Sequence, residues 1–146
     1  MLKGIPKILS PELLKVLAEM GHSDRLVISD GNFPAESMGK DAIVIRCDGH
    51  GVPELLDAIL QVFPLDTYVE HPVNLMEVMP GDDVETPIWD TYKEIICKYD
   101  DRGDAVVGNI ERFAFYEEAK KVYAIIATGE SALYANIMLQ KGVVTD

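Results

Sequence analysis

Segments with helical spacing and segments with strand character alternate along nearly the whole chain, and this alternation constrains the fold more than any other feature. Residues 10–12 (SPE) predict a helix start, because they combine a hydroxyl N-cap, a proline at the first helical position and an acidic residue near the helix N-terminus. Apolar residues then recur at helical spacing up to Gly21, a natural helix stop. The segments 25–30 (RLVISD) and 42–46 (AIVIR) have the composition of short strands.

The same alternation continues through the rest of the chain. Further helices are expected from Pro53, over 87–99 and over 111–121. Further strands are expected at 73–79, 105–110, 122–128 and 136–144. Helices lie between most of these strands, which indicates largely parallel neighbours in a helix-covered sheet. We therefore predict an α/β fold with a mixed or mostly parallel sheet of five or six strands, forming one domain over residues 1–146.

The chain carries a strong negative charge. Its 146 residues include 25 acidic and 13 basic side chains, which gives a formal charge of −12. Nucleic acids and anionic membrane surfaces are bound by concentrated basic surfaces, and the densest basic spot, at 120–121, is closely preceded by a pair of glutamates at 117–118. We therefore expect neither a nucleic-acid partner nor a membrane partner. The hydrophobic share of 48% indicates that some apolar surface is buried between subunits.

The cysteines and histidines form no recognisable metal or disulfide pattern. Cys47 and Cys97 are far apart and belong to no CxxC motif, and His22, His50 and His71 lack the spacing of metal ligands. No run approaches the roughly 18 apolar residues of a membrane-spanning helix, and the first residues do not have the pattern of a signal peptide. These features predict a protein of the reducing cytoplasm that uses no metal.

One candidate for acid–base chemistry is a histidine followed by a carboxylate. His22 comes directly after the predicted helix stop, and Asp30 ends the next strand. If the two side chains meet, the carboxylate can hold the imidazole in one tautomer for proton transfer near neutral pH. The alternative is that His22 only caps the helix C-terminus, where a cation suits the helix dipole. Spacing alone favours this alternative.

Two later segments place polar side chains between predicted elements. Arg112 and Tyr116 lie between a strand and a helix, and Tyr134 and Asn136 follow the turn 128–130 (TGE). Guanidinium and phenol groups offer the hydrogen-bonding functions that suit a neutral polyol. Composition alone explains these segments equally well as an exposed arginine beside packed aromatic residues and an ordinary glycine-containing turn.

Several separated blocks resemble the fucose mutarotase/ribose pyranase family in both order and spacing. The blocks are SPELL at 10–14, MGH at 20–22, Asp30, NFP at 32–34, RFAFYE at 112–117, TGE at 128–130, Tyr134, Asn136 and KGV at 141–143. The resemblance extends from about Leu2 to Val144, apart from the segment 82–104. The NFP block favours the fucose branch. The sequence departs from the family pattern at Gly31, Glu118 and Ser131.

This resemblance implies a three-layer α/β fold assembled into a ring-shaped homo-oligomer, commonly a decamer, with the sugar bound near a subunit boundary. It also implies that His22 is the catalytic proton donor. Asp30, Arg112, Tyr134 and Asn136 match the sugar-binding positions of the family. Tyr116 is expected to contribute as well.

The implied activity is that of a cofactor-independent isomerase, a mutarotase that interconverts the α and β anomers of L-fucose by ring opening and closure. We expect His22 to act as the main acid and base, and Asp30 to orient it or to bind a sugar hydroxyl. Phe33 or Trp89 is expected to face the 6-methyl group of the sugar. Two alternatives stay open: a D-ribose pyranase that interconverts pyranose and furanose forms, and a non-catalytic monosaccharide-binding module.

Overall fold

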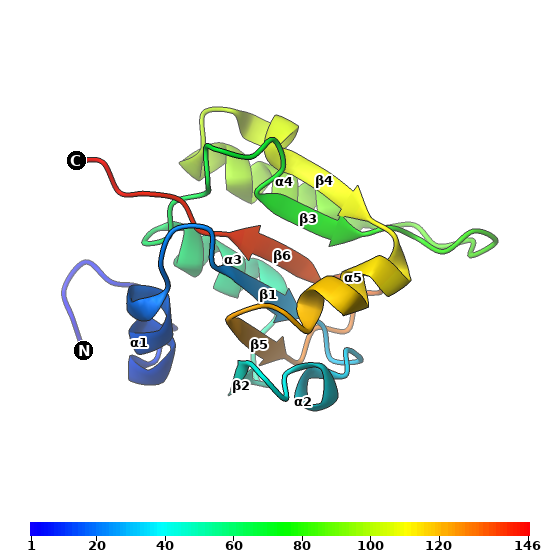
Figure 1. Ribbon diagram of the computed structural model, residues 1–146, viewed down its shortest axis with the longest axis horizontal. Coiled ribbons are helices and arrows are strands. Elements are labelled where there is room, and N and C mark those ends of the chain that lie inside the picture. The colour runs from blue at the N-terminus through cyan, green and yellow to red at the C-terminus, as the bar shows by residue number, and fades with distance from the viewer.

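A six-stranded sheet runs through the middle of the molecule (Figure 1). The computed structural model describes all residues from Met1 to Asp146. The strands are β1 (Arg25–Ser29), β2 (Ile43–Cys47), β3 (Val73–Met76), β4 (Val107–Ile110), β5 (Ala124–Thr128) and β6 (Ile137–Gln140). The helices are α1 (Pro11–Glu19), α2 (Ala35–Met38), α3 (Val52–Leu60), α4 (Pro87–Tyr99) and α5 (Arg112–Ala119), and Gly103–Val106 form the 3₁₀ turn η1.

Only one strand of the sheet runs against its neighbours. The spatial order is β2-β5-β1-β6-β3-β4, in which β6 is antiparallel to β1 and β3 and all other pairs are parallel. The arrows of Figure 1 show β6 pointing opposite to β1, β3 and β4. The predicted mixed or mostly parallel sheet of five or six strands is therefore confirmed. Because β6 is reversed, it begins at the sheet edge where β1 and β3 end.

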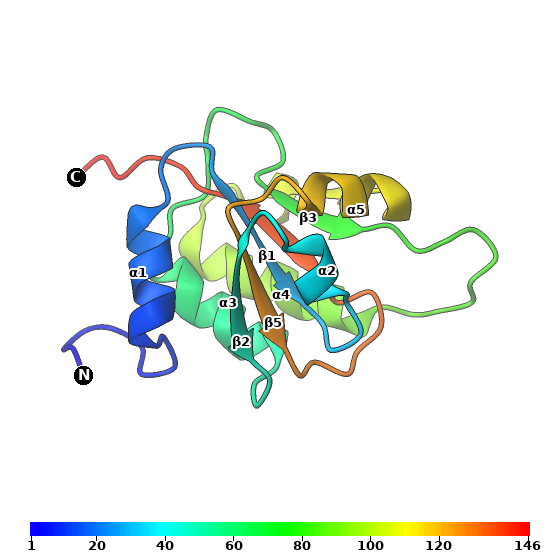
Figure 2. The same cartoon turned by 60° about the horizontal axis from the view of Figure 1, so that its bottom comes forward.

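Helices cover both faces of the sheet, which confirms the three-layer α/β prediction. Alternate residues of β1 point to opposite faces, so that Leu26 and Ile28 join the larger core under α1, α3 and α4. Val27 joins the smaller core under α2 and α5. Figure 2 shows α2 and α5 on one side of the sheet and α3 and α4 on the other. Each fully buried aliphatic side chain in these cores contributes about 1.5–3 kcal/mol to folding.

Several element boundaries differ from those expected. The last strand ends at Gln140 instead of continuing to Val144, because Gln140 already pairs with Arg25, the first residue of β1, and no strand extends further. Val143 and Val144 are exposed. The third strand ends at Met76, where the chain leaves the sheet. The four-residue helix α2 and the turn η1 were not expected, because elements this short carry little periodicity.

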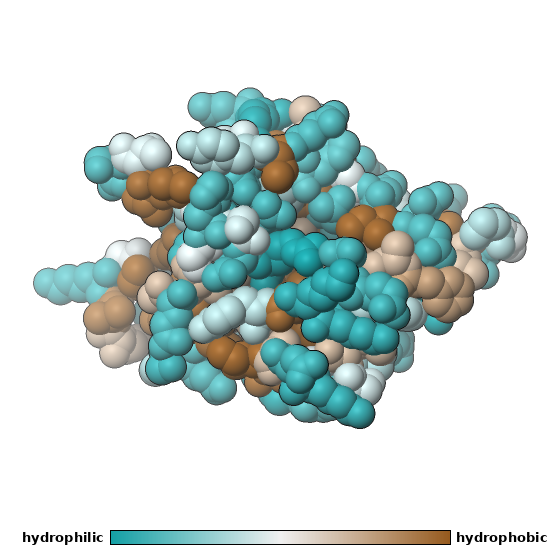
Figure 3. All heavy atoms as spheres, viewed as in Figure 1, coloured by the Kyte–Doolittle hydropathy of each residue, from teal (hydrophilic) through white to brown (hydrophobic).

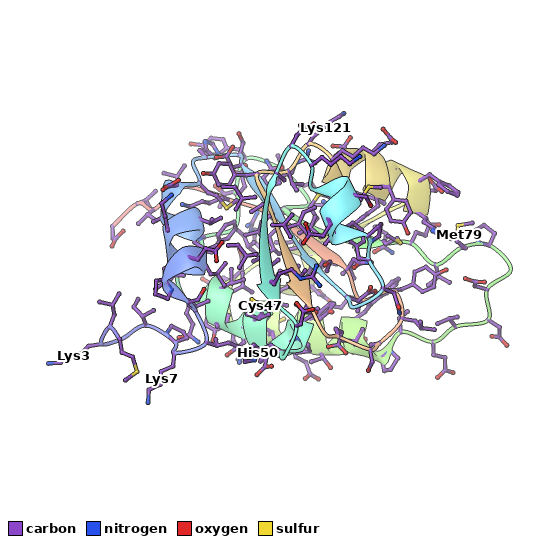
Figure 4. The ribbon with its side chains drawn as sticks, turned by 90° about the horizontal axis from the view of Figure 1, so that it is seen from below. Lys3, Lys7, Cys47, His50, Met79 and Lys121 are labelled. Atoms are coloured by element: carbon purple, nitrogen blue, oxygen red, sulfur yellow. The ribbon has the colours of Figure 1, made fainter.

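A long loop between β3 and α4 projects from one end of the molecule. Figure 4 shows this segment, which carries Met79, extending beyond the helices. The opposite end of the molecule carries both termini, and hydrophobic atoms gather there in the space-filling view (Figure 3). None of the helices is both long enough and apolar enough to cross a lipid bilayer.

Candidate functional site

A pocket lies at the sheet edge where the parallel strands end. Asp30 follows β1, Met76 ends β3, Arg112 begins α5 directly after β4, and Asn136 precedes the reversed strand β6. The pocket has a volume of about 250 Å³ and is open to solvent. Its lining consists of Asp30, Asn32, Phe33, Met76, Arg112, Tyr116, Leu133, Tyr134 and Asn136. Functional side chains often gather at this edge in α/β folds, and here it brings residues from distant parts of the chain together.

Asp30 is the buried acid of the pocket. Its side chain accepts hydrogen bonds from the backbone N–H groups of Asn32 (3.1 Å) and Ala135 (3.4 Å). Its own N–H donates to Oδ1 of Asn136 at 2.8 Å, which joins the two residues. Burial raises the pKa of Asp30 above its ordinary value, although the backbone hydrogen bonds oppose this. The result is a fixed carboxyl group with acceptor capacity directed at the pocket.

Arg112 provides the positive charge of the pocket. Its Nε donates to the hydroxyl of Tyr116 at 3.3 Å. The guanidinium lies over the rings of Phe113 and Tyr116, at 5.6 and 5.5 Å from their centroids. The ring of Phe33 contacts that of Tyr116, with centroids 5.7 Å apart. A planar cation, a phenol and an aromatic wall thus face the same space, which is a combination suited to a neutral sugar with one apolar side.

Tyr134 enters the pocket from an unusual backbone conformation. Its φ angle is +53°, in the left-handed region that non-glycine residues seldom adopt. Helix α4 holds this segment: the indole N–H of Trp89 donates to the Tyr134 carbonyl at 2.7 Å, and the hydroxyl of Tyr92 donates to the Ala135 carbonyl at 2.6 Å. The hydroxyl of Tyr134 contacts Asp82 and the N–H of Met79 on the projecting loop.

His22 does not lie in this pocket. It precedes β1, whereas Asp30 follows it, so the two residues are at opposite ends of the strand. At about 3.3 Å per residue, the five residues of β1 alone span about 17 Å. The expectation that His22 and Asp30 meet is therefore wrong within one chain. The tight return between α1 and β1 brings the histidine only to the start of the strand.

A different carboxylate orients His22. Nε2 of His22 is 3.0 Å from Oδ1 of Asp66, whose side chain is only 1% exposed. Burial would raise the pKa of Asp66, but hydrogen bonds from the Tyr68 N–H, the Gln140 amide and His22 outweigh it and lower the pKa. A charged Asp66 accepts a hydrogen bond from the Nε2–H group and leaves Nδ1 as the free ring nitrogen. The imidazole itself is 42% exposed and is therefore accessible.

The alternative role for His22, that of a helix cap, is also wrong. Lys141 provides that cap instead, because its Nζ donates to the carbonyls of Leu17 and Met20 at 2.8 and 2.6 Å. The ring of His22 lies beside that of Tyr68, with centroids 5.0 Å apart, and Tyr68 is 77% exposed. His22, Asp66 and Tyr68 thus form a second polar site, which we call the histidine site, at the opposite sheet edge from the pocket.

The turn after β5 has a structural role. The carboxylate of Glu130 accepts hydrogen bonds from the N–H of Val52, at the start of α3, at 3.1 Å, and from the N–H of Ala132 at 3.2 Å.

The remaining candidate residues lie outside the pocket. Trp89, one of the two residues expected to form an apolar wall, does not line the pocket, whereas Phe33 does. His50 pairs with Glu54 at the surface. No three His, Cys, Asp or Glu side chains lie together in an arrangement that could hold a metal ion.

Sequence reasoning assigned no site role to five residues of these two sites: Asn32, Asp66, Tyr68, Met76 and Leu133. Asp66 is 44 residues away from its histidine in the sequence and belongs to no local motif. The sequence did contain one signal for Asp66, because an aspartate that directly follows an apolar segment ending in Leu65 can be buried. A buried acid requires hydrogen-bond partners, which marks it as a candidate site residue. Met76 resembled an ordinary core residue inside the strand expected at 73–79.

Comparisons with known proteins give a consistent result. The profile of the RbsD / FucU transport protein family matches residues 3–144. Fucose mutarotase of Homo sapiens is 51% identical over 148 residues, which cover 97% of this chain and 94% of the relative. L-fucose mutarotase of Actinobacillus pleuropneumoniae serotype 5b is 50% identical over 143 residues, which cover 98% of this chain and 97% of the relative.

Solved structures agree with these matches. The crystal structure of FucU from Bifidobacterium longum has a TM-score of 0.97 and 67% identity, and the match covers 98% of this chain and all of that one. The crystal structure of the fucose mutarotase from Streptococcus pneumoniae in complex with L-fucose has a TM-score of 0.91 and 49% identity, and covers 99% of this chain and all of that one.

Proposed function

Because this chain belongs to the RbsD / FucU transport protein family, we propose that it is an L-fucose mutarotase, an isomerase that interconverts the α and β anomers of the sugar. The observation that carries the proposal is the match, over 99% of the chain, to a fucose mutarotase whose crystal structure contains L-fucose. The polar pocket at the strand ends also supports the proposal, because it offers a carboxylate, a guanidinium and an aromatic wall to one small neutral ligand.

The reaction needs only acid–base chemistry and positioning. A base removes the proton of the anomeric hydroxyl, an acid delivers a proton to the ring oxygen, and the C1–O5 bond breaks to give the open-chain aldehyde. After rotation about the C1–C2 bond, the C5 hydroxyl attacks the opposite face of the aldehyde and the ring closes. Positioned acid–base groups are typically worth about 10²–10⁴-fold in rate. The proposal therefore includes no cofactor and no metal.

We assign the acid–base role to His22, whose Nδ1 is free and whose Nε2 is held by Asp66. A histidine oriented in this way can accept a proton at Nδ1 and return it to another oxygen of the sugar. The sugar hydroxyls are assigned to Asp30, Arg112 and Asn136, together with Tyr116 and Tyr134. Phe33 forms the aromatic wall that is available to the 6-methyl group.

We propose that a second copy of the chain bridges the distance between His22 and the pocket. If one sugar contacts both His22 and Arg112, a neighbouring subunit must bring its histidine site to this subunit's pocket. Exposed aromatic and aliphatic side chains beside the two sites support such a contact: Tyr68 next to His22, and Phe113 and Leu133 next to the pocket. Each copy then contributes to two active sites.

The wider assembly and location are part of the same proposal. A head-to-tail contact between the histidine site of one copy and the pocket of the next is heterologous, and such contacts close into rings when the rotation permits. We propose a ring-shaped homo-oligomer, a decamer by family resemblance, built from one domain per chain. The free cysteines Cys47 and Cys97 suit a reducing compartment, which for this protein we take to be the cytoplasm.

Saturation-transfer NMR on L-fucose tests this function. We expect the wild-type protein to accelerate exchange between the α and β anomeric proton signals at catalytic concentration, and His22→Ala to lose this acceleration while the assembly persists in size-exclusion chromatography. D-arabinose is the matched control sugar, because it has the same ring hydroxyls without the methyl group. We expect its kcat/KM to be lower by about tenfold or more, the usual value of an apolar contact of this size.

The result separates the possible functions. Equal exchange in the wild type and His22→Ala would remove the histidine from its role. Binding of L-fucose without any acceleration would indicate a non-catalytic sugar-binding protein. Faster interconversion of the pyranose and furanose forms of D-ribose than of the fucose anomers would make it a ribose pyranase.

A further inference from the structure

The projecting loop at residues 77–86 makes a specific contact with the pocket. Most of its side chains are exposed, but two of its groups bind the hydroxyl of Tyr134. The N–H of Met79 donates to this hydroxyl at 3.2 Å, and the hydroxyl donates to the carboxylate of Asp82. Figure 4 shows that Met79 belongs to the segment that extends away from the sheet. The hydroxyl of a pocket residue is therefore held by a loop that lies outside the strands and helices.

The hydrogen-bonding capacity of a phenol limits what Tyr134 can still do. A phenolic hydroxyl has one proton to donate and accepts through its lone pairs. Its proton is directed at Asp82, and one acceptor position is occupied by Met79. The hydrogen bond to Asp82 raises the pKa of Tyr134, so the phenol stays protonated and remains the donor in this pair. Only acceptor capacity is left for a ligand.

We propose that Asp82 is a positioning residue of the sugar site, which fixes the Tyr134 hydroxyl as a hydrogen-bond acceptor for one sugar hydroxyl. This inference rests on the proposed function, and it assigns a role to the 77–86 loop that the pocket lining alone does not reveal. Asp82 does not itself line the pocket. It acts through Tyr134, and its charge strengthens the hydrogen bond that holds the phenol in place.

Fixing the phenol in this way gives the pocket a defined pattern of donors and acceptors. Arg112 can only donate, and an ionised Asp30 can only accept. A freely rotating phenol could either donate a hydrogen bond to a sugar hydroxyl or accept one from it. A phenol whose proton is already used can only accept, so the sugar must present a hydroxyl proton at that position. The backbone of Tyr134 is already held by Trp89, so the loop is the element that determines the direction of the hydroxyl. A site with fixed polar groups discriminates more strongly between polyols than an adaptable one.

The first test compares two neighbouring aspartates. Asp82→Asn keeps the size of the side chain but removes the carboxylate, whereas Asp83→Asn makes the same change at an exposed residue without a hydrogen bond to the pocket. Mutarotation of freshly dissolved α-L-fucose is followed by polarimetry over a range of sugar concentrations. We expect Asp82→Asn to raise KM by about threefold to tenfold, the equivalent of one hydrogen bond, with kcat within about twofold of the wild type. Asp83→Asn should match the wild type.

The second test asks whether Asp82 acts through Tyr134. In a double-mutant cycle, Asp82→Asn should have no further effect on KM in a Tyr134→Phe background, because the hydroxyl that it positions is already gone. Additive effects of the two substitutions would overturn the inference. An unchanged KM in Asp82→Asn, or an equal rise in Asp83→Asn, would overturn it as well.

The same cycle can be measured by calorimetric binding of L-fucose, which keeps the two proposals separate. If the wild type binds the sugar but does not accelerate mutarotation, the proposed function fails, and the cycle on Kd still decides the role of Asp82. Thermal melting of each variant shows whether the loop substitution has altered the fold.

Discussion

At the scale of single residues, the structure separates two groups that the sequence placed close together. His22 was a candidate because it follows a helix stop, and Asp30 because it ends a strand; both are where the sequence predicted them. Local spacing could not predict that the two side chains lie far apart. They flank β1, and residues that flank a strand lie at its opposite ends. The histidine obtains its carboxylate from Asp66 instead. Partners this remote in sequence are determined by the sheet and not by any motif.

Asp66 also makes a testable contribution to stability. Asp66→Asn replaces two acceptor oxygens by one and leaves a buried donor unpaired, so we expect a loss of about 1–3 kcal/mol in the free energy of unfolding at pH 7. Because the pKa of Asp66 is lowered in the folded state, its charged form stabilises the protein above about pH 4. This contribution is lost as the pH falls through the lowered pKa.

The measurement is urea denaturation of the wild type and Asp66→Asn between pH 3 and pH 7. The difference between the two proteins should be largest near neutral pH and should shrink below about pH 4, because the Asp66 carboxyl of the unfolded wild type binds a proton there before that of the folded protein does. The exposed Asp101→Asn is the matched control and should follow the wild type. A difference that stays constant over the whole range would contradict the assigned ionisation.

At the scale of elements, the reversed strand β6 determines the site. The alternation of helices and strands in the sequence was sufficient to predict a helix-covered sheet, and most long elements lie where periodicity placed them. Periodicity carries no information on strand direction or order. The antiparallel insertion of β6 between β1 and β3 brings Tyr134 and Asn136 beside Asp30, and this is the step that the sequence pattern alone could not supply.

The turn between β5 and β6 shows how neighbouring elements are joined. Glu130 accepts the N–H of Val52 at the start of α3, where backbone N–H groups have no partner within the helix. We expect Glu130→Ala to lower the free energy of unfolding by about 1 kcal/mol, the usual value of a helix cap. Glu130→Gln keeps an acceptor oxygen and should restore part of this loss. Chemical denaturation measures both, and equal stability of the alanine variant and the wild type would show that the contact contributes nothing.

At the scale of the whole molecule, one chain carries a pocket and a histidine site at opposite ends of β1. In the proposed function, the pocket binds the sugar hydroxyls and His22 of the histidine site moves the protons. The acidic composition argued against nucleic-acid and membrane partners, and the apolar share indicated contacts between copies. Which surfaces meet could not be predicted from the sequence, because Tyr68, Phe113 and Leu133 become meaningful only when their places in the fold are known.

The most direct test of this account is complementation between two inactive variants. His22→Ala keeps an intact pocket, and Arg112→Ala keeps an intact histidine site, so each variant alone should fail to accelerate anomer exchange in L-fucose. When the two chains are unfolded together in equal amounts and refolded, about a quarter of the subunit boundaries should combine an intact pocket with an intact histidine. Saturation-transfer NMR should then detect about a quarter of the wild-type exchange rate. Refolded mixtures that stay as inactive as the separate variants would contradict a catalytic site shared between two copies.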